Sequence, residues 1–243
     1  RLQRLRPGYG YNNLPDKTAN DMQPNDDGIW LVDLQNNRSV LRKTLKEIAT
    51  YRPHPSMVGA QHYINHLSLN PSGTVYMFFH LWMDQNNRRY SRLFTSETDG
   101  NGLFLINNFG PVSHYTWLDD ESIVVTTNIS NNQYRYIVYH YKDGFKEIIG
   151  DNHLLLDGHP TYKSETNVII TDTYPNFLCE QKLLQYDISL RKLRILDRLY
   201  IPPSFHGEFR CDLHPRISPT GRNIIIDVVK KNKRSIKIIK DIK

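Results

Sequence analysis

Cysteine is scarce in this chain of 243 residues, and no long apolar segment occurs in it. The only two cysteines, Cys179 and Cys211, lie far apart and lack the spacing of a zinc finger. A disulfide framework is therefore not expected, and both residues are predicted to pack in a reducing compartment. No apolar run approaches the roughly 18 residues that a membrane helix needs, so we expect no membrane span.

Several functional motifs are also missing. No Gly-x-Ser-x-Gly segment occurs, which disfavours a serine hydrolase. No glycine-rich phosphate loop, recognition helix or basic-aromatic sheet motif occurs, so nucleic acid is not the expected partner. The basic residues 1–6 are followed by Pro7-Gly8-Tyr9-Gly10-Tyr11 instead of the apolar stretch of a secretory signal. We expect a cytoplasmic protein, or a periplasmic one if a signal precedes Arg1.

The net charge is +6 and the isoelectric point is about 9.2, which predicts attraction to anions. Acidic glycans, nucleic acids and phospholipid surfaces all fit this charge. Part of it clusters in residues 230–234 and 237–243, where a solvated turn and an exposed last strand are expected. The charge therefore does not select one partner.

Four segments share a histidine followed by a strand-like stretch, a turn and a second strand. The histidines are His66, His114, His159 and His214, and they are separated by 48, 45 and 55 residues. This period is typical of one four-stranded blade of a β-propeller. Because blades are related by rotation about an axis, the four side chains are predicted to face one channel. The alternative for each histidine is a structural hydrogen bond to the adjacent blade.

The remaining pattern is almost entirely that of β-strands. We predict an all-β propeller forming one domain over residues 1–243, with three complete four-stranded blades and two partial ones. Short helices are expected only within residues 39–49 and 53–59. Since closed propellers avoid open edge strands, we expect further N-terminal blades and a total of seven.

Several segments resemble the TolB-type propellers that include the oligogalacturonate lyases. The resemblance covers nearly the whole chain, and it is closest to uncharacterised lyase-like propellers. It is carried by Asp157-Gly158-His159-Pro160, residues 171–175, 210–216 and 218–221, and by the segments at 6–11 and 25–30.

The resemblance implies a divalent metal, manganese in the lyases, that binds a uronate carboxylate while a basic side chain removes the neighbouring proton. By pattern, His214 falls on the last metal histidine of that family and His159 on a second ligand. Asp212 stands where the lyases carry another histidine, and its carboxylate suits manganese. The glutamine ligand of the family has no clear counterpart near Glu208.

Other residues are candidates for catalysis and substrate binding. His114 and His66 could transfer a proton, because imidazole titrates in the useful range. Arg210 and Arg216 flank the Asp212-Leu213-His214 segment and could clamp a carboxylate. The alternative is an ion pair, either between Arg210 and Asp212 or between two blades. Substrate-binding roles are also assigned to Arg6, Tyr9 and Glu208.

These residues predict metal-assisted β-elimination on an acidic, uronate-containing carbohydrate. The alternative is a non-catalytic propeller that binds glycans or proteins in a polysaccharide pathway. The sequence does not decide between them, and it leaves the oligomeric state open.

Overall fold

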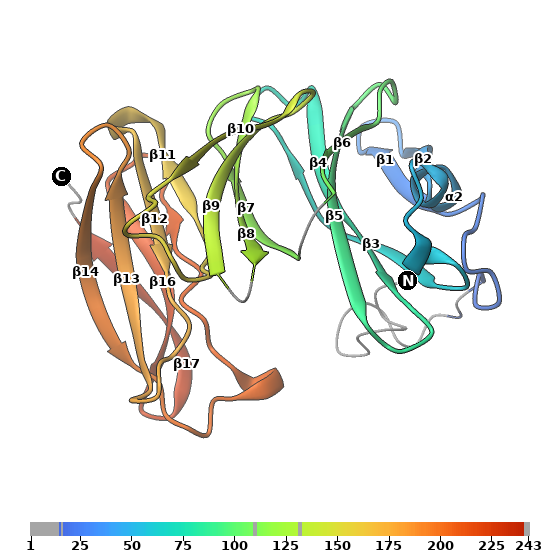
Figure 1. Ribbon diagram of the computed structural model, residues 1–243. Coiled ribbons are helices and arrows are strands. Elements are labelled where there is room, and N and C mark those ends of the chain that lie inside the picture. The colour runs from blue at the N-terminus through green and yellow to red at the C-terminus, as the bar shows by residue number, and fades with distance from the viewer. Residues whose placement is uncertain (1–14, 16, 109–110, 131–132, 241–243) are drawn as a thin grey trace. The chain divides into compact units, whose positions relative to one another are not determined.

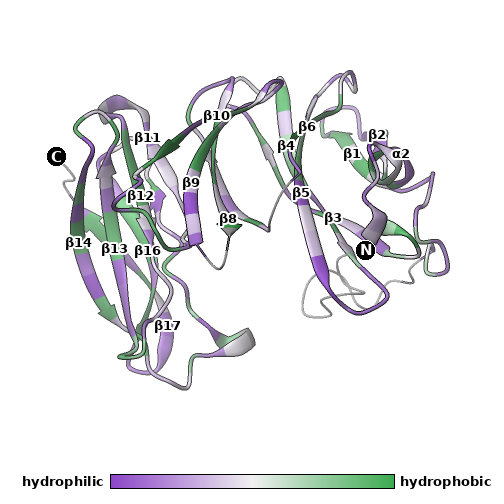
Figure 2. Ribbon diagram, in the orientation of Figure 1, coloured by the Kyte–Doolittle hydropathy of each residue, from purple (hydrophilic) through white to green (hydrophobic). Residues whose placement is uncertain are grey.

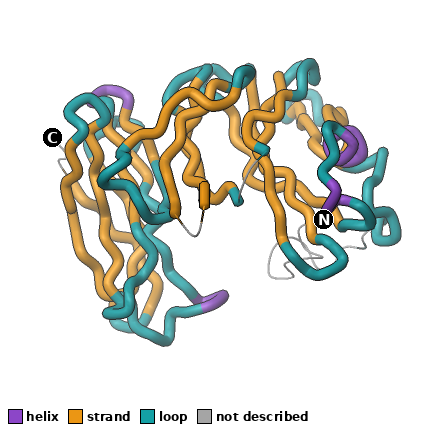
Figure 3. Tube along the Cα trace, viewed as in Figure 1, coloured by secondary structure: helices purple, strands orange, loops and turns teal. Residues whose placement is uncertain are grey.

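The computed structural model describes residue 15 and residues 17–108, 111–130 and 133–240. Strands dominate the chain, and the helical segments are short (Figures 1 and 3). The chain divides into two compact units, Arg1–Pro111 with Tyr141–Gly144, and Val112–His140 with Phe145–Lys243. No helix of the described residues has the length and apolar character needed to cross a membrane.

The first unit contains a hairpin and one antiparallel sheet of four strands. The hairpin pairs β1 (Gly28–Asp33) with β2 (Arg38–Thr44) and leads into α2 (Leu45–Thr50) and the 3-10 turn η1 (Pro55–Met57). Thr44 and Glu47 form a capping box that starts α2. The sheet has the order β3 (Gln61–Leu69), β4 (Val75–Met83), β5 (Arg89–Glu97) and β6 (Phe104–Asn107).

The second unit contains three antiparallel sheets, and β10 begins at its boundary. The first sheet joins β7 (Val112–Trp117), β8 (Ser122–Ser130), β9 (Gln133–His140) and β10 (Gly144–Ile149). The second joins β11 (Thr161–Lys163), β12 (Val168–Asp172), β13 (Glu180–Asp187) and β14 (Lys192–Tyr200), with η2 at Ser164–Thr166. The third joins β15 (Arg216–Ile217), β16 (Asn223–Lys230) and β17 (Lys233–Lys240), and η3 (Gly207–Phe209) precedes it.

The fold is a β-propeller built from these sheets. The prediction of three complete and two partial blades is confirmed, because three sheets have four strands, one has three and one has two. The segments α2 and η1 lie where short helices were expected, although α2 ends one residue later, at Thr50. The expectation of no other helical segment was wrong, because the 3-10 turns η2 and η3 lie elsewhere in the chain. The total of seven blades stays a prediction.

Neighbouring sheets of the second unit stack through side chains that alternate along each strand. In β12, Ile169 packs in a cluster with Val124 and Tyr136 of the preceding sheet. The next residue, Ile170, packs in a different cluster with Ile224 of the following sheet. Since successive side chains of a strand point to opposite faces, one strand contributes to two cores. Figure 2 shows the resulting mixture of hydrophobic and hydrophilic stretches along β13 and β14.

A buried chain of hydrogen bonds crosses the sheet of the first unit. Arg92 Nε donates to His80 Nδ1 at 3.0 Å, and His80 Nε2 lies 2.9 Å from His62 Nδ1. Because arginine can only donate, the proton of His80 must be on Nε2 and points at His62. The remaining donors of Arg92 bind the carbonyls of Ile48 and Arg52. Neither His62 nor His80 belongs to the four repeat histidines, and the sequence pattern does not connect them to Arg92.

The protein should lose stability as the pH falls below about 6.5, the pKa of an unfolded histidine. Burial, together with the nearby Arg92, holds the pKa of His80 well below its usual range. Below this pH the unfolded chain binds a proton on this imidazole and the folded chain does not. The free energy of unfolding therefore falls by up to about 1.4 kcal/mol for each pH unit. Urea unfolding at pH 7.5 and 5.5 measures this slope. His80→Asn, which keeps an acceptor without titrating, should flatten the slope, and an unchanged slope would contradict the assignment.

Candidate metal centre

Three of the four repeat histidines form a row in the second unit. His114 lies in β7, and His159 and His214 come just before β11 and β15. The ring centroids of His114 and His159 are 3.9 Å apart, and those of His159 and His214 are 4.1 Å apart. His66 belongs to β3 of the first unit, where its ring lies 4.9 Å from Phe79. The structure thus brings three histidines together, and the ring of four stays a prediction.

The local chain path that places each histidine is repeated as well. In each of the three sheets, a residue on the second strand lies 12 or 13 positions after the histidine. It forms a hydrogen bond with the segment that carries the histidine. The His114 N–H donates to Thr126 Oγ1 at 2.9 Å, and the His159 N–H donates to Asp172 Oδ1 at 2.7 Å. At the third site the Asp227 N–H donates to the carbonyl next to His214, that of Leu213, at 2.8 Å.

Each of the three imidazoles has an aspartate beside Nδ1. The distances from Nδ1 to the carboxylate are 3.2 Å for His114 and Asp157 and 2.9 Å for His159 and Asp172. His214 Nδ1 lies 3.6 Å from Asp227, which is beyond hydrogen-bond distance. A carboxylate at Nδ1 orients the ring and favours Nε2 as the nitrogen that binds a metal or exchanges a proton.

Asp157 and Asp212 occupy equivalent positions, each two residues before a row histidine. Asp157 is saturated: its oxygens accept from the Ser113 and Thr126 hydroxyls at 2.6 and 2.9 Å and from the Gly158 N–H. These bonds and the His114 ring outweigh burial, so the pKa of Asp157 is lowered. The Asp157 carboxylate is therefore fully occupied by hydrogen-bond donors of the protein itself.

Asp212 differs because one of its oxygens is unsatisfied. Arg210 Nε donates to Asp212 Oδ2 at 2.8 Å. Oδ1 lies 2.7 Å from the same nitrogen but is buried and accepts no hydrogen bond. This oxygen therefore has the Arg210 charge beside it but no hydrogen-bond donor, which leaves it available as a ligand. The ion pair that sequence analysis offered as the alternative for Arg210 is confirmed.

His159, Asp212 and His214 can hold a metal ion. Their donor atoms all lie within 4.8 Å of one another. Two imidazoles and one carboxylate suit manganese, iron or zinc and leave positions for further ligands. His159 and Asp212 are buried, whereas His214 is exposed, so the group reaches solvent on one side. Burial and the nearby His159 lower the pKa of His214, which favours the neutral, ligating form.

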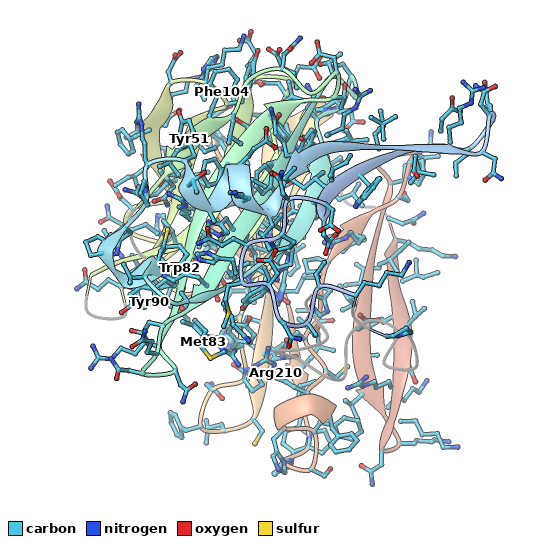
Figure 4. The ribbon with its side chains drawn as sticks, turned by 90° about the vertical axis from the view of Figure 1, so that its right-hand side faces the viewer. Tyr51, Trp82, Met83, Tyr90, Phe104 and Arg210 are labelled. Carbon is cyan, nitrogen blue, oxygen red and sulfur yellow. The ribbon has the colours of Figure 1, made fainter. Side chains whose placement is uncertain are left out.

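Tyr174 and Arg210 form one wall of this centre. The Arg210 guanidinium lies over the Tyr174 ring, 4.5 Å from its centroid, and the Tyr174 ring meets His159 edge-on at 5.7 Å. Figure 4 labels Arg210 close to the helical turn η3 that precedes it. Burial, and to a smaller extent the nearby Asp157, raises the pKa of Tyr174. Tyr174 is therefore a neutral support for Arg210.

The remaining candidate site residues are Arg216, Glu208, Arg6 and Tyr9. Arg216 donates to the carbonyl of Pro215 beside it, and among the described residues it has no bond to the three ligands. Glu208 lies in η3, but its side chain is outside the described part of the chain, as are Arg6 and Tyr9. Their substrate-binding roles stay predictions.

The aspartates beside the three imidazoles were not among the predicted site residues. Asp157, Asp172 and Asp227 were not singled out, although two signals were present. The Asp-x-His-Pro sequence occurs twice, at 157–160 and 212–215, and an aspartate follows His159 and His214 by the same 13 residues. Comparing the blades position by position would have identified these pairs.

Comparisons with known proteins identify the fold. No protein-family model matches the chain, and no curated protein matches it. Among solved structures, it is similar to an oligogalacturonate lyase in complex with manganese, with a TM-score of 0.61 and 12% identity over 86% of this chain and 53% of that one. It also matches TolB from Acinetobacter baumannii, with a TM-score of 0.48 and 14% identity over 87% of this chain and 50% of that one.

The chain thus spans about half the length of these two propellers. At this identity the likeness to the lyase shows a shared β-propeller fold, and the resemblance stated from the sequence motifs agrees with it.

Proposed function

We propose that the protein is a carbohydrate-active propeller that uses a divalent metal, manganese in the first instance, for β-elimination on a uronate-containing oligosaccharide. The observation that carries this proposal is the grouping of His159, Asp212 and His214 beside Arg210. Metal ligands, a guanidinium and a further imidazole meet in one place, which is the equipment that elimination next to a carboxylate requires. The fold shared with a manganese-binding lyase supports it.

Each group has a distinct part in this chemistry. A metal held by the three ligands would neutralise the uronate carboxylate and so make the C5 proton easier to remove. His114 takes that proton, and Asp157 at its Nδ1 stabilises the imidazolium that results. The electrons of the C5–H bond form the C4–C5 double bond. The C4–O bond breaks with its electrons on the oxygen of the leaving sugar, which takes a proton from water. Arg210 binds a carboxylate oxygen through its guanidinium.

The test is to incubate the protein with polygalacturonate, alginate and glucuronan, each with and without manganese. Elimination creates a conjugated double bond, so we expect a rise in ultraviolet absorbance with one of these polymers that depends on the metal. The same protein treated with a chelator is the control. Absence of product with every uronan at saturating manganese would rule out the lyase.

The alternative is a propeller that binds glycans or proteins without turnover, and one contact favours it. His114 is bonded to Asp157, which precedes the next sheet, so the pair also ties two blades together. In that case glycan binding without product is expected, and His114→Ala would lower thermal stability instead of turnover.

A further inference from the structure

We propose that Arg210 couples the metal to the anionic ligand, so that a divalent cation binds tightly only together with a carboxylate. This inference rests on the proposed function, because it assumes that His159, Asp212 and His214 hold the cation. It assigns Arg210 a role that the metal ligands do not have. The positive charge of its guanidinium makes the affinity for the metal depend on the anionic ligand.

Two cations, the Arg210 guanidinium and the metal ion, would share the carboxylate of Asp212. Arg210 Nε lies 2.7 and 2.8 Å from its two oxygens, and one of these oxygens belongs to the metal-binding group. The Asp212 side chain is only 8% exposed, so water screens the charges weakly. A dication and a guanidinium on one poorly hydrated carboxylate repel each other, and this repulsion weakens metal binding.

Arg210 cannot easily avoid this repulsion by leaving. Its guanidinium is stacked on Tyr174, its own N–H donates to the carbonyl of Gly207, and its carbonyl accepts from Arg234 at 3.0 Å. These contacts fix both the backbone and the plane of the side chain. The positive charge is therefore a built-in part of the site.

The same guanidinium has donors left for a ligand. The hydrogen bond to Asp212 comes from Nε, and the two terminal nitrogens make no hydrogen bond within the described part of the chain. The Arg210 side chain is 46% exposed, so a ligand can reach these nitrogens. A carboxylate could accept two parallel bonds from such a fork. Placed between the guanidinium and the metal, its negative charge relieves their repulsion. By linkage, metal and carboxylate then raise each other's affinity by the same factor.

Calorimetric titration with Mn²⁺ tests this coupling, with and without saturating galacturonate. For the unmodified protein we expect the Kd for Mn²⁺ to fall about tenfold when galacturonate is present, within the usual range of such couplings. Arg210→Gln should bind Mn²⁺ about tenfold more tightly without galacturonate, and galacturonate should then have little effect. Arg194→Gln removes an equal charge from an exposed arginine in β14 of the same unit and should behave like the unmodified protein.

Arg210→Lys is a second test variant, for the case that Arg210→Gln fails to fold. It keeps the charge near Asp212 without the fork, so Mn²⁺ affinity should stay low while the galacturonate effect shrinks. Unchanged or weaker Mn²⁺ binding in Arg210→Gln, with the fold intact by circular dichroism, would overturn the coupling but leave the lyase proposal standing. If the unmodified protein bound no Mn²⁺ under either condition, both proposals would fall.

Discussion

Replacing His114 by alanine should reduce the rate of uronate elimination by about 10²- to 10⁴-fold, the usual contribution of a general base, with near-normal binding of uronate oligomers. The base acts in the transition state, so its loss is felt in kcat and little in ground-state affinity. The structure supports the choice, because Asp157 lies at Nδ1 of His114 and orients the ring toward its neighbour His159. Product formation under saturating Mn²⁺, together with a titration of oligogalacturonate binding, measures the two effects separately.

His140→Ala is the matched control for His114→Ala. His140 is half-buried at the end of β9 and lies 3.8 Å from Glu121, away from the three ligands. Its replacement should leave turnover within about twofold, because its contact with Glu121 involves none of the three candidate ligands. Full activity in His114→Ala would remove it as the base, and parallel loss of binding and stability would assign it to the blade tether.

Replacing His159 by alanine should lower Mn²⁺ affinity by 100-fold or more, on the order of what loss of one of three protein ligands costs a site of this kind. His159 is the central residue: it supplies a donor to the metal group, its N–H and Nδ1 both bind Asp172, and its ring contacts the rings of His114 and His214. Equilibrium dialysis with metal analysis measures the loss directly.

Two further variants sharpen the His159 experiment. Asp172→Asn keeps the shape but weakens the acceptor for His159 and for the His214 N–H, so an intermediate loss of about 10- to 100-fold is expected. His153→Ala removes a histidine that packs on Tyr186 and should not change Mn²⁺ binding. Equal affinities in all four proteins would show that the metal binds elsewhere.

The blade organisation could be predicted from the sequence, because it depends on strand and turn patterns and on the length of the repeat. Alternating side chains and turn residues define each strand, and a repeat of about 50 residues places His114, His159 and His214 at equivalent points. Equivalent positions converge in a propeller, which is why those three rings meet. The candidate ligands His159, Asp212 and His214 followed from the resemblance, and their donor atoms do lie close to one another.

The partners of these side chains were decided by the tertiary structure. Asp157 and Asp212 have the same place in the sequence repeat, yet four donors saturate one carboxylate and a single guanidinium engages the other. Which donors reach a carboxylate depends on neighbouring sheets and loops, here Ser113 and Thr126 for Asp157. No local pattern contains that information.

The sequence by itself determined the all-β fold, the division into three complete and two partial blades, and the equivalent positions of His114, His159 and His214. Strand patterns act over a few residues, and the repeat length can be read directly along the chain. Only the tertiary structure decided that Asp212 keeps an unsatisfied oxygen beside Arg210, and that Arg92, His80 and His62 form one buried chain. Hydrogen bonds and charges act over a few ångströms in space, and those distances exist only once the strands have paired and the sheets have stacked.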